Sequence, residues 1–210
     1  MPSNANQNIK AVVFDYGDVI ELHEGGGALR NTAELIDVPL AEFRNAYFQH
    51  NHLANAENLN WYDMFRKVLS TFNVSKEKEA EVMSMVRERE LKTKINTDLV
   101  ALFPKLQQLG LKVGILSNST SRLRERLNQN GIAKLVDVVV ISGEIGFQKP
   151  HKEAFQVLFE KLNLLPQEVI FVDDSTRSLE KAAEIGYVPI LFKNNEQLKV
   201  DLITAGVSLF

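Results

Sequence analysis

The sequence contains no cysteine along its 210 residues, so disulfides, thiolate metal sites and a cysteine nucleophile are all excluded. It also lacks any apolar run near the ~20 residues that cross a bilayer. The opening stretch, MPSNANQNIK, has neither the apolar core of a signal peptide nor the arginine-rich pattern of a transit peptide. We therefore expect a cytoplasmic protein with no membrane partner.

Basic charge is not in excess, since the formal net charge is −3. This balance gives no basic face, which argues against nucleic acid as a partner. No internal repeat or low-complexity tract interrupts the chain. The length fits one domain with an insertion, or two small domains, and is ample for a sizeable core.

The most informative stretch is Lys10 to Glu21, KAVVFDYGDVIE. Its four apolar residues, Ala11 to Phe14, have no polar break, which predicts a short strand buried on both faces. The run stops at Asp15, and a glycine and an aspartate then predict a turn. A carboxylate at the carboxyl end of a buried strand stands where open α/β sheets place their chemistry.

Residues 21–95 carry no strand signal, and we interpret them as an all-helical insert. Apolar side chains recur at helical spacing in several places. The clearest run is Trp61, Met64, Phe65, Val68 and Phe72. We expect these residues to form the insert's own core rather than a ligand site.

After Thr97, stretches with a strand pattern alternate with stretches that have a helical pattern. An amphipathic helix is predicted from there to Leu109, with a kink at Pro104. Strands are then predicted over 112–116, 137–141, 168–172 and 188–192, each separated from the next by a helical stretch. This alternation predicts an α/β fold with a parallel sheet and right-handed crossovers. The core is then discontinuous, built from 1–20 and 96–210.

Three predicted strands end in polar clusters: Asp15, the Ser117–Thr120 run, and the pair Asp173 and Asp174. The carboxyl ends of parallel strands share one edge, so these groups should converge. Each cluster taken alone is equally consistent with a helix or turn cap. Lys149 precedes a proline and is, taken alone, an ordinary surface charge.

Converging carboxylates repel one another unless a cation lies among them. Oxygen ligands without cysteine favour a hard ion such as Mg²⁺. A nearby hydroxyl and a lysine suit the other oxygens of a phosphoryl group. Asp15 is then placed to attack phosphorus and form an aspartyl-phosphate that water hydrolyses.

Four stretches in order, FDYGDVI, LSNS, GEIGFQKP and FVDDS, resemble the four motifs of the haloacid dehalogenase superfamily. The helical insert after the first motif is similar to the cap of its small phosphatase-type members. The resemblance covers the chain past residue 9. It implies a Rossmann-like three-layer core with the first strand in the middle of the sheet.

The resemblance also implies roles for individual residues. Asp15 would be the nucleophile and a metal ligand, and Lys149 would neutralise both the nucleophile and the phosphate. Ser117 would bind phosphate with help from the Asn118 backbone. The Mg²⁺ ligands would be Asp15, the Gly17 carbonyl and Asp174, with Asp173 in a direct or water-mediated role.

Gly17 departs from the usual phosphatase pattern, which has a second aspartate at this position. That aspartate transfers protons during the reaction, and losing such a group typically costs ~10²–10⁴ in rate. The sequence resembles the glucose-1-phosphate phosphatase-like branch in having glycine here. Glu21, His23 or a cap residue is our hypothesis for the replacement.

We therefore expect a Mg²⁺-dependent phosphatase of a small phosphorylated metabolite, with a sugar phosphate as one candidate. One alternative is a 2-haloacid dehalogenase, although such enzymes need no Mg²⁺ and by resemblance lack the acid pair Asp173 and Asp174. A phosphomutase is disfavoured because Gly17 cannot transfer protons. The remaining alternative is a protein of this fold that binds a phospho-ligand or partner without turnover. The sequence does not indicate an oligomeric state.

Overall fold

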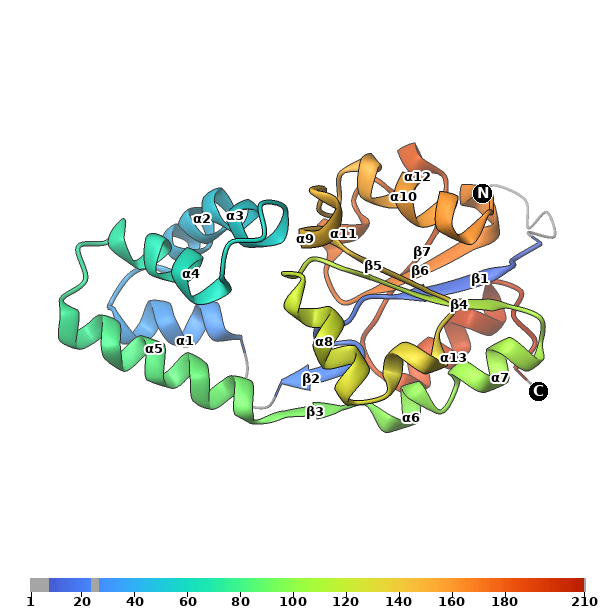
Figure 1. Ribbon diagram of the computed structural model, residues 1–210, viewed down its shortest axis with the longest axis horizontal. Coiled ribbons are helices and arrows are strands. Elements are labelled where there is room, and N and C mark those ends of the chain that lie inside the picture. The colour runs from blue at the N-terminus through green and yellow to red at the C-terminus, as the bar shows by residue number, and fades with distance from the viewer. Residues whose placement is uncertain (1–7, 24–26, 210) are drawn as a thin grey trace.

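A five-stranded parallel sheet lies at the centre of the structure (Figure 1). The computed structural model describes residues 8–23 and 27–209. The strands follow the order β5-β4-β1-β6-β7, and every neighbouring pair is parallel. Their bounds are β1 Ala11–Phe14, β4 Lys112–Ser117, β5 Val138–Ile141, β6 Val169–Asp173 and β7 Val188–Leu191. The predicted parallel sheet is confirmed, with the first strand in its middle.

Strand β1 is buried on both faces, as its unbroken apolar run predicts. All four of its residues are 0% exposed. Val12 and Phe14 point into one apolar cluster, whereas Ala11 and Val13 point into another. Because side chains alternate across a strand, one short segment contributes to both halves of the core.

Helices cover both faces of the sheet and complete a three-layer α/β core (Figure 1). One face packs against α6 Thr97–Val100, α7 Phe103–Gln108, α8 Arg122–Gln129, η1 Ile132–Leu135 and α13 Asn195–Thr204. The helical segments on the other side are α9 Ser142–Ile145, α10 Lys152–Leu162, η2 Pro166–Glu168, α11 Thr176–Leu179 and α12 Ala182–Ile185. Phe14 stacks on Phe103 across the first interface, with ring centroids 5.1 Å apart.

The prediction of one kinked helix from Thr97 to Leu109 is wrong. Two separate helices, α6 and α7, occupy this segment, and Pro104 lies in the first turn of the second. Proline is well tolerated there because the first backbone N–H groups of a helix have no intrahelical partner. Pro104 therefore starts a helix rather than bending one.

The insert is a group of helices with a core of its own. Its helices are α1 Ala28–Leu35, α2 Leu40–His50, α3 His52–Asn55, α4 Trp61–Ser70 and α5 Lys76–Leu91. Phe43, Met64, Phe65 and Val68 are fully buried in a separate cluster, and Trp61 stacks on Phe65 at 4.7 Å. The predicted insert core is confirmed. We refer to these helices as the cap.

The prediction that 21–95 is helical throughout is wrong at both ends. Glu21–His23 forms β2 and Thr93–Ile95 forms β3, and the two pair as an antiparallel ribbon between the cap and the sheet. Each strand has only three residues, and its partner lies about seventy residues away in sequence. Local periodicity cannot detect such a pairing.

Within 8–23 and 27–209, no helix combines the length and the apolar character needed to span a bilayer.

Candidate active site

Asp15 directly follows β1 at the carboxyl edge of the sheet. Its backbone N–H donates to the carbonyl of Val172 at 2.8 Å, which extends the pairing of β1 with β6. The next backbone N–H, that of Tyr16, donates to Asp15 Oδ1 at 2.7 Å. These two bonds fix both the backbone and the side chain of Asp15.

Lys149 joins the carboxylates of two neighbouring strands. Its Nζ lies 2.8 Å from Asp15 Oδ1 and 2.6 Å from Asp173 Oδ2. Its side chain is 1% exposed, compared with 14% for Asp15 and 0% for Asp173. Lys149 is therefore a buried cation shared by two carboxylates. The sequence alone favoured a surface charge, whereas the family resemblance placed it here.

The charged form of Lys149 is stabilised by its partners. Burial by itself would lower the pKa of this amine, but attraction to Asp15 and Asp173 outweighs burial and raises the pKa. The ammonium also lies 5.0 Å from the centroid of the Phe171 ring, which adds a cation–π contact. The lysine therefore stays protonated at neutral pH.

Asp15 has an unusual proton affinity. Burial raises the pKa of its carboxyl, Lys149 opposes that rise, and the charge of Asp173 adds to it; the resulting pKa is about 7. Asp15 Oδ1 contacts both Lys149 and the Tyr16 N–H. Oδ2 makes no hydrogen bond within 8–23 and 27–209, so it is the oxygen available to a reacting group.

Asp174 completes a cluster of three carboxylates with Asp15 and Asp173. One oxygen from each lies within 4.8 Å of the others. Desolvation and the charges of Asp173 and Asp18 raise the pKa of Asp174 to about 6. Mutual repulsion of this kind is relieved by a cation, and an all-oxygen donor set suits Mg²⁺. The residues therefore fit a Mg²⁺ ion.

Asp173 differs from the other two acids because both of its oxygens already have partners. Oδ1 accepts from the backbone N–H of Ser175 at 2.8 Å, and Oδ2 contacts Lys149. Asp174 is exposed, and apart from its own backbone N–H no described residue is hydrogen-bonded to its side chain. This difference favours Asp174 as the direct ligand of a cation.

Ser117 and Asn118 lie at the end of β4, beside the acids. Ser117 is 4% exposed, and its hydroxyl makes no hydrogen bond with any residue the structure describes. The Asn118 side chain instead clamps the Lys149 backbone: Oδ1 accepts from N–H at 2.7 Å and Nδ2 donates to the carbonyl at 3.0 Å. No sequence signal indicated this clamp, because the two residues are 31 positions apart.

Comparison with known proteins identifies the family of this chain. Residues 27–191 match the family of haloacid dehalogenase-like hydrolases, which is most of the chain. The chain belongs to this family. The matched segment begins after Asp15, so the geometry of the first motif rests on the structure described above.

Individual relatives and solved structures match nearly all of the chain. A phosphatase of Mycobacterium tuberculosis is 27% identical over 209 residues, which is 91% of each protein. A family enzyme of Bacteroides thetaiotaomicron, solved with magnesium and inorganic phosphate, has a TM-score of 0.61 at 19% identity and covers 90% of this chain and 98% of its own. A family phosphatase from Thermococcus onnurineus has a TM-score of 0.56 at 21% identity, covering 89% and 87%.

Gly17, the departure from the usual haloacid dehalogenase-like phosphatase motif, stands beside open space. A Cβ added there would meet no heavy atom within 4 Å, and the backbone is not in the left-handed region. Gly17 is therefore not required by sterics or backbone conformation, so the missing aspartate is a difference in chemistry rather than a consequence of packing.

Asp18 and His23 form a pair beside this open space. His23 Nδ1 lies 2.9 Å from Asp18 Oδ1, and the His23 N–H donates to the same oxygen at 3.3 Å. Burial would raise the pKa of Asp18, but the hydrogen bonds from His23 and its charge outweigh burial and lower that pKa. The Asp18 charge also acts on Asp174, so this pair borders the carboxylate cluster.

Glu21 is only 6% exposed, and its carboxylate already has partners of its own. It accepts a hydrogen bond from the Tyr16 hydroxyl at 3.2 Å and forms an ion pair with Arg126. Arg126 also lies 3.8 Å from Glu90 of the cap helix α5. Glu21 therefore ties the turn after β1 to α8.

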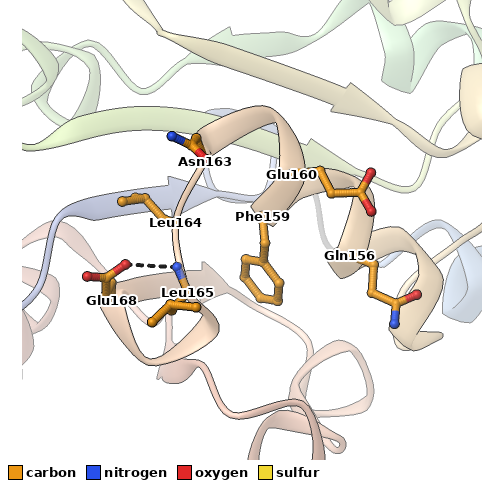
Figure 2. Close-up of a pocket in the computed structure, with 7 residues that line it drawn as sticks. All are labelled: Gln156, Phe159, Glu160, Asn163, Leu164, Leu165 and Glu168. Atoms are coloured by element: carbon orange, nitrogen blue, oxygen red, sulfur yellow. Dashed lines mark hydrogen bonds between the residues drawn. The ribbon is translucent and has the colours of Figure 1, made fainter.

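A surface hollow of about 620 Å³ is remote from these groups (Figure 2). Figure 2 shows it at the end of α10, where the Leu165 N–H donates to Glu168 at 2.8 Å. Glu168 immediately precedes β6 and pairs with Lys10, which precedes β1. The hollow therefore lies at the amino edge of the sheet, opposite Asp15, and we assign it no catalytic role.

Proposed function

We propose that the protein is a phosphatase that hydrolyses a small phosphorylated metabolite through an aspartyl-phosphate on Asp15. The observation that carries this proposal is the buried Lys149 ammonium, held within 2.8 Å of Asp15 and 2.6 Å of Asp173. Such a cation offsets the negative charge of both a carboxylate nucleophile and an incoming phosphate. The phosphatase name of the Mycobacterium tuberculosis relative supports the same activity.

In the first step, Asp15 Oδ2 attacks phosphorus while Lys149 and the Tyr16 N–H hold Oδ1. The bond from Oδ2 to phosphorus forms as the bond from phosphorus to the leaving oxygen breaks. The leaving oxygen takes a proton from the group that replaces the aspartate missing at Gly17, and it departs as an alcohol. In the second step, water gives a proton back to that group and attacks phosphorus; the bond from phosphorus to Oδ2 breaks, which releases inorganic phosphate and restores the Asp15 carboxylate. Ser117 and the Asn118 N–H would orient the phosphoryl oxygens.

Mg²⁺ would be held by Asp15, Asp174 and the Gly17 carbonyl, with Asp173 acting through a bound water. When bound, the ion would neutralise charge on the phosphoryl oxygens. The assignment of Asp173 follows from its two existing partners, Ser175 and Lys149. Gly17 retains a carbonyl whatever its side chain, so the loss of the aspartate does not remove that ligand.

Proton transfer needs a replacement for the aspartate missing at Gly17, and His23 is the better of our two named candidates. Glu21 already contacts Tyr16 and Arg126, which oppose its swinging toward a substrate. His23 is oriented by Asp18 at the border of the acid cluster. An imidazole can both donate and accept a proton, so His23 suits this task. A pH–rate profile that is unchanged in His23→Asn but altered in Glu21→Gln would reverse this preference.

The paired acids Asp173 and Asp174 argue against a 2-haloacid dehalogenase, which needs no metal. A sugar phosphate remains one candidate substrate, and the cytoplasmic location expected from the sequence stays a prediction.

The test is release of inorganic phosphate from a panel of phosphorylated metabolites, with Mg²⁺ and with excess chelator. We expect Mg²⁺-dependent release that is lost in Asp15→Asn and kept in the surface control Asp98→Asn. No release from any compound, with Mg²⁺ still bound, would replace the proposal with a non-catalytic binding role. Chloride release from a 2-haloacid without metal would replace it with the dehalogenase.

A further inference from the structure

We propose that Asn58 is a positioning residue that fastens the cap to the turn after β4. That turn, residues 118–121, follows Ser117 and begins with Asn118, the candidate phosphate-binding residues. The inference rests on the proposed function, because it concerns how the phosphate site and the cap close together. It adds a residue from the cap to a site otherwise built from the core.

Asn58 makes two hydrogen bonds across the boundary between the cap and the core. Its Nδ2 donates to Ser121 Oγ at 2.9 Å, and its Oδ1 accepts from the Ser121 backbone N–H at 2.8 Å. The two residues are 63 positions apart in the chain. Both ends of one amide thus engage a single residue of the turn, which fixes the approach of the cap loop.

The cap loop is built to present this side chain. Asn58 has a φ of 58°, a left-handed conformation that asparagine tolerates better than most residues. On either side of it, Leu59 N–H donates to the Leu53 carbonyl at 2.8 Å, and Asn60 caps helix α4 by accepting from Tyr62 N–H at 2.9 Å. Figure 1 shows the α3–α4 end of the cap facing α9 of the core.

Gly143, in α9, provides the space into which Asn58 fits. A Cβ on this glycine would lie 2.9 Å from Asn58 Oδ1 and 2.8 Å from the carbonyl oxygen of Ser119. The Gly143 N–H donates to that same carbonyl at 2.9 Å, and Ser142 Oγ accepts from Ser119 N–H at 3.0 Å. The turn is therefore held by α9 on one side and by Asn58 on the other.

A continuous set of contacts then leads from the cap to the nucleophile. Asn58 holds Ser121, the turn carries Asn118, and the Asn118 side chain clamps the backbone of Lys149. Lys149 contacts Asp15. Displacing the cap loop would free one side of the turn that positions this lysine.

Among the described contacts between the cap and the core, two pairs of side chains lie away from this turn. Arg177 of α11 lies 4.3 Å over the ring of Phe48 in α2. Arg126 of α8 lies 3.8 Å from Glu90 of α5. Both are partly exposed pairs, which typically contribute little. Asn58 is therefore the cap residue best placed to act on phosphate binding.

The first measurement is hydrogen exchange of the Ser121 amide in ligand-free Asn58→Gly. Glycine accepts a positive φ, so the loop backbone is retained while the side chain is removed. We expect exchange to accelerate roughly tenfold, as for the loss of about two ordinary hydrogen bonds. The matched control is Asn73→Gly, another cap asparagine with positive φ, 51°, which should leave this amide unchanged. Ser121→Ala keeps the N–H bond and should weaken the cap contact less.

The second measurement is the affinity for inorganic phosphate with Mg²⁺, followed by fluorescence of Trp61, the sole tryptophan. We expect Asn58→Gly to raise the phosphate Kd and the KM roughly tenfold, with a smaller effect on kcat. Unchanged Ser121 exchange would overturn the cap–turn contact, and faster exchange with unchanged Kd and KM would overturn the positioning role. Absence of phosphate release in the wild type would refute the proposed function, while the exchange comparison still decides whether Asn58 holds the turn.

Discussion

Replacing Lys149 with methionine removes the ammonium but keeps an apolar stem of similar length beside Phe171. Two carboxylates then lose a cation that lies 2.8 Å and 2.6 Å away. At an effective dielectric constant of about 20, each contact corresponds to roughly 6 kcal/mol of attraction before desolvation is subtracted. Measured losses on breaking such buried pairs are ~3–5 kcal/mol, and we expect that loss for Lys149→Met at pH 8 without metal.

The size of this loss should depend on pH. Burial raises the pKa of Asp15 to about 7, so the folded state binds this proton more tightly than the unfolded chain does. Stability from Asp15 is therefore fully present below about pH 4 and is lost as pH rises toward about 7. Without Lys149 the Asp15 pKa rises further, so a protonated Asp15 at pH 5 no longer needs a cation. The loss should thus be clearly smaller at pH 5 than at pH 8.

Urea unfolding with excess chelator at the two pH values measures this directly. The control is Lys152→Met, an exposed lysine in the first turn of α10, which should stay within about 0.5 kcal/mol of wild type. An equal loss for Lys149→Met at both pH values would contradict the raised Asp15 pKa. No loss at pH 8 would contradict the buried cation itself.

Three further predictions concern the same site. Gly17→Asp should raise the phosphate-release rate of the His23→Asn variant at least ~10-fold, since the position has room for a side chain and general acid–base catalysis supplies ~10²–10⁴. No gain in that background would mean that His23 does not transfer the proton. The affinity for Mg²⁺, measured by titration calorimetry, should weaken from pH 8 to pH 5.5. Protons compete with the ion at Asp15 and Asp174, whose pKa values are about 7 and about 6. An affinity that stays constant would argue against these two ligands. Asn118→Ala should destabilise the fold by ~1–3 kcal/mol and lower kcat, because it removes both hydrogen bonds to the Lys149 backbone. The control Asn128→Ala, on the exposed side of α8, should do neither. Equal effects of the two substitutions would refute the role of Asn118 in holding Lys149.

The sheet and its carboxyl edge were predictable because their signals are local. An unbroken apolar run from Ala11 to Phe14 can be buried only between two layers, and the polar residues after it mark the end of the strand. The alternation of strands and helices then places Asp15, Ser117 and Asp173 at one edge through the rule for parallel sheets. The helical spacing around Phe65 likewise predicted the core of the cap.

The features that sequence reasoning missed depend on partners far apart in the chain. The β2–β3 ribbon joins Leu22 to Lys94, and neither three-residue strand has a periodic pattern of its own. Asn118 and Asn58 each act through a single side chain. Their hydrogen bonds form only when the turn after β4 packs against α9 and the cap. Local propensity carries no information about contacts between residues so far apart in the chain.

Asp15 should become phosphorylated during turnover. The most direct measurement is acid quenching of a reaction with the best substrate from the panel, followed by mass spectrometry of the peptide that contains Asp15. We predict a transient phosphoryl group on that aspartate, absent in Asp15→Asn and absent without Mg²⁺. Phosphate release that continues in Asp15→Asn, with no label on this peptide, would contradict the account.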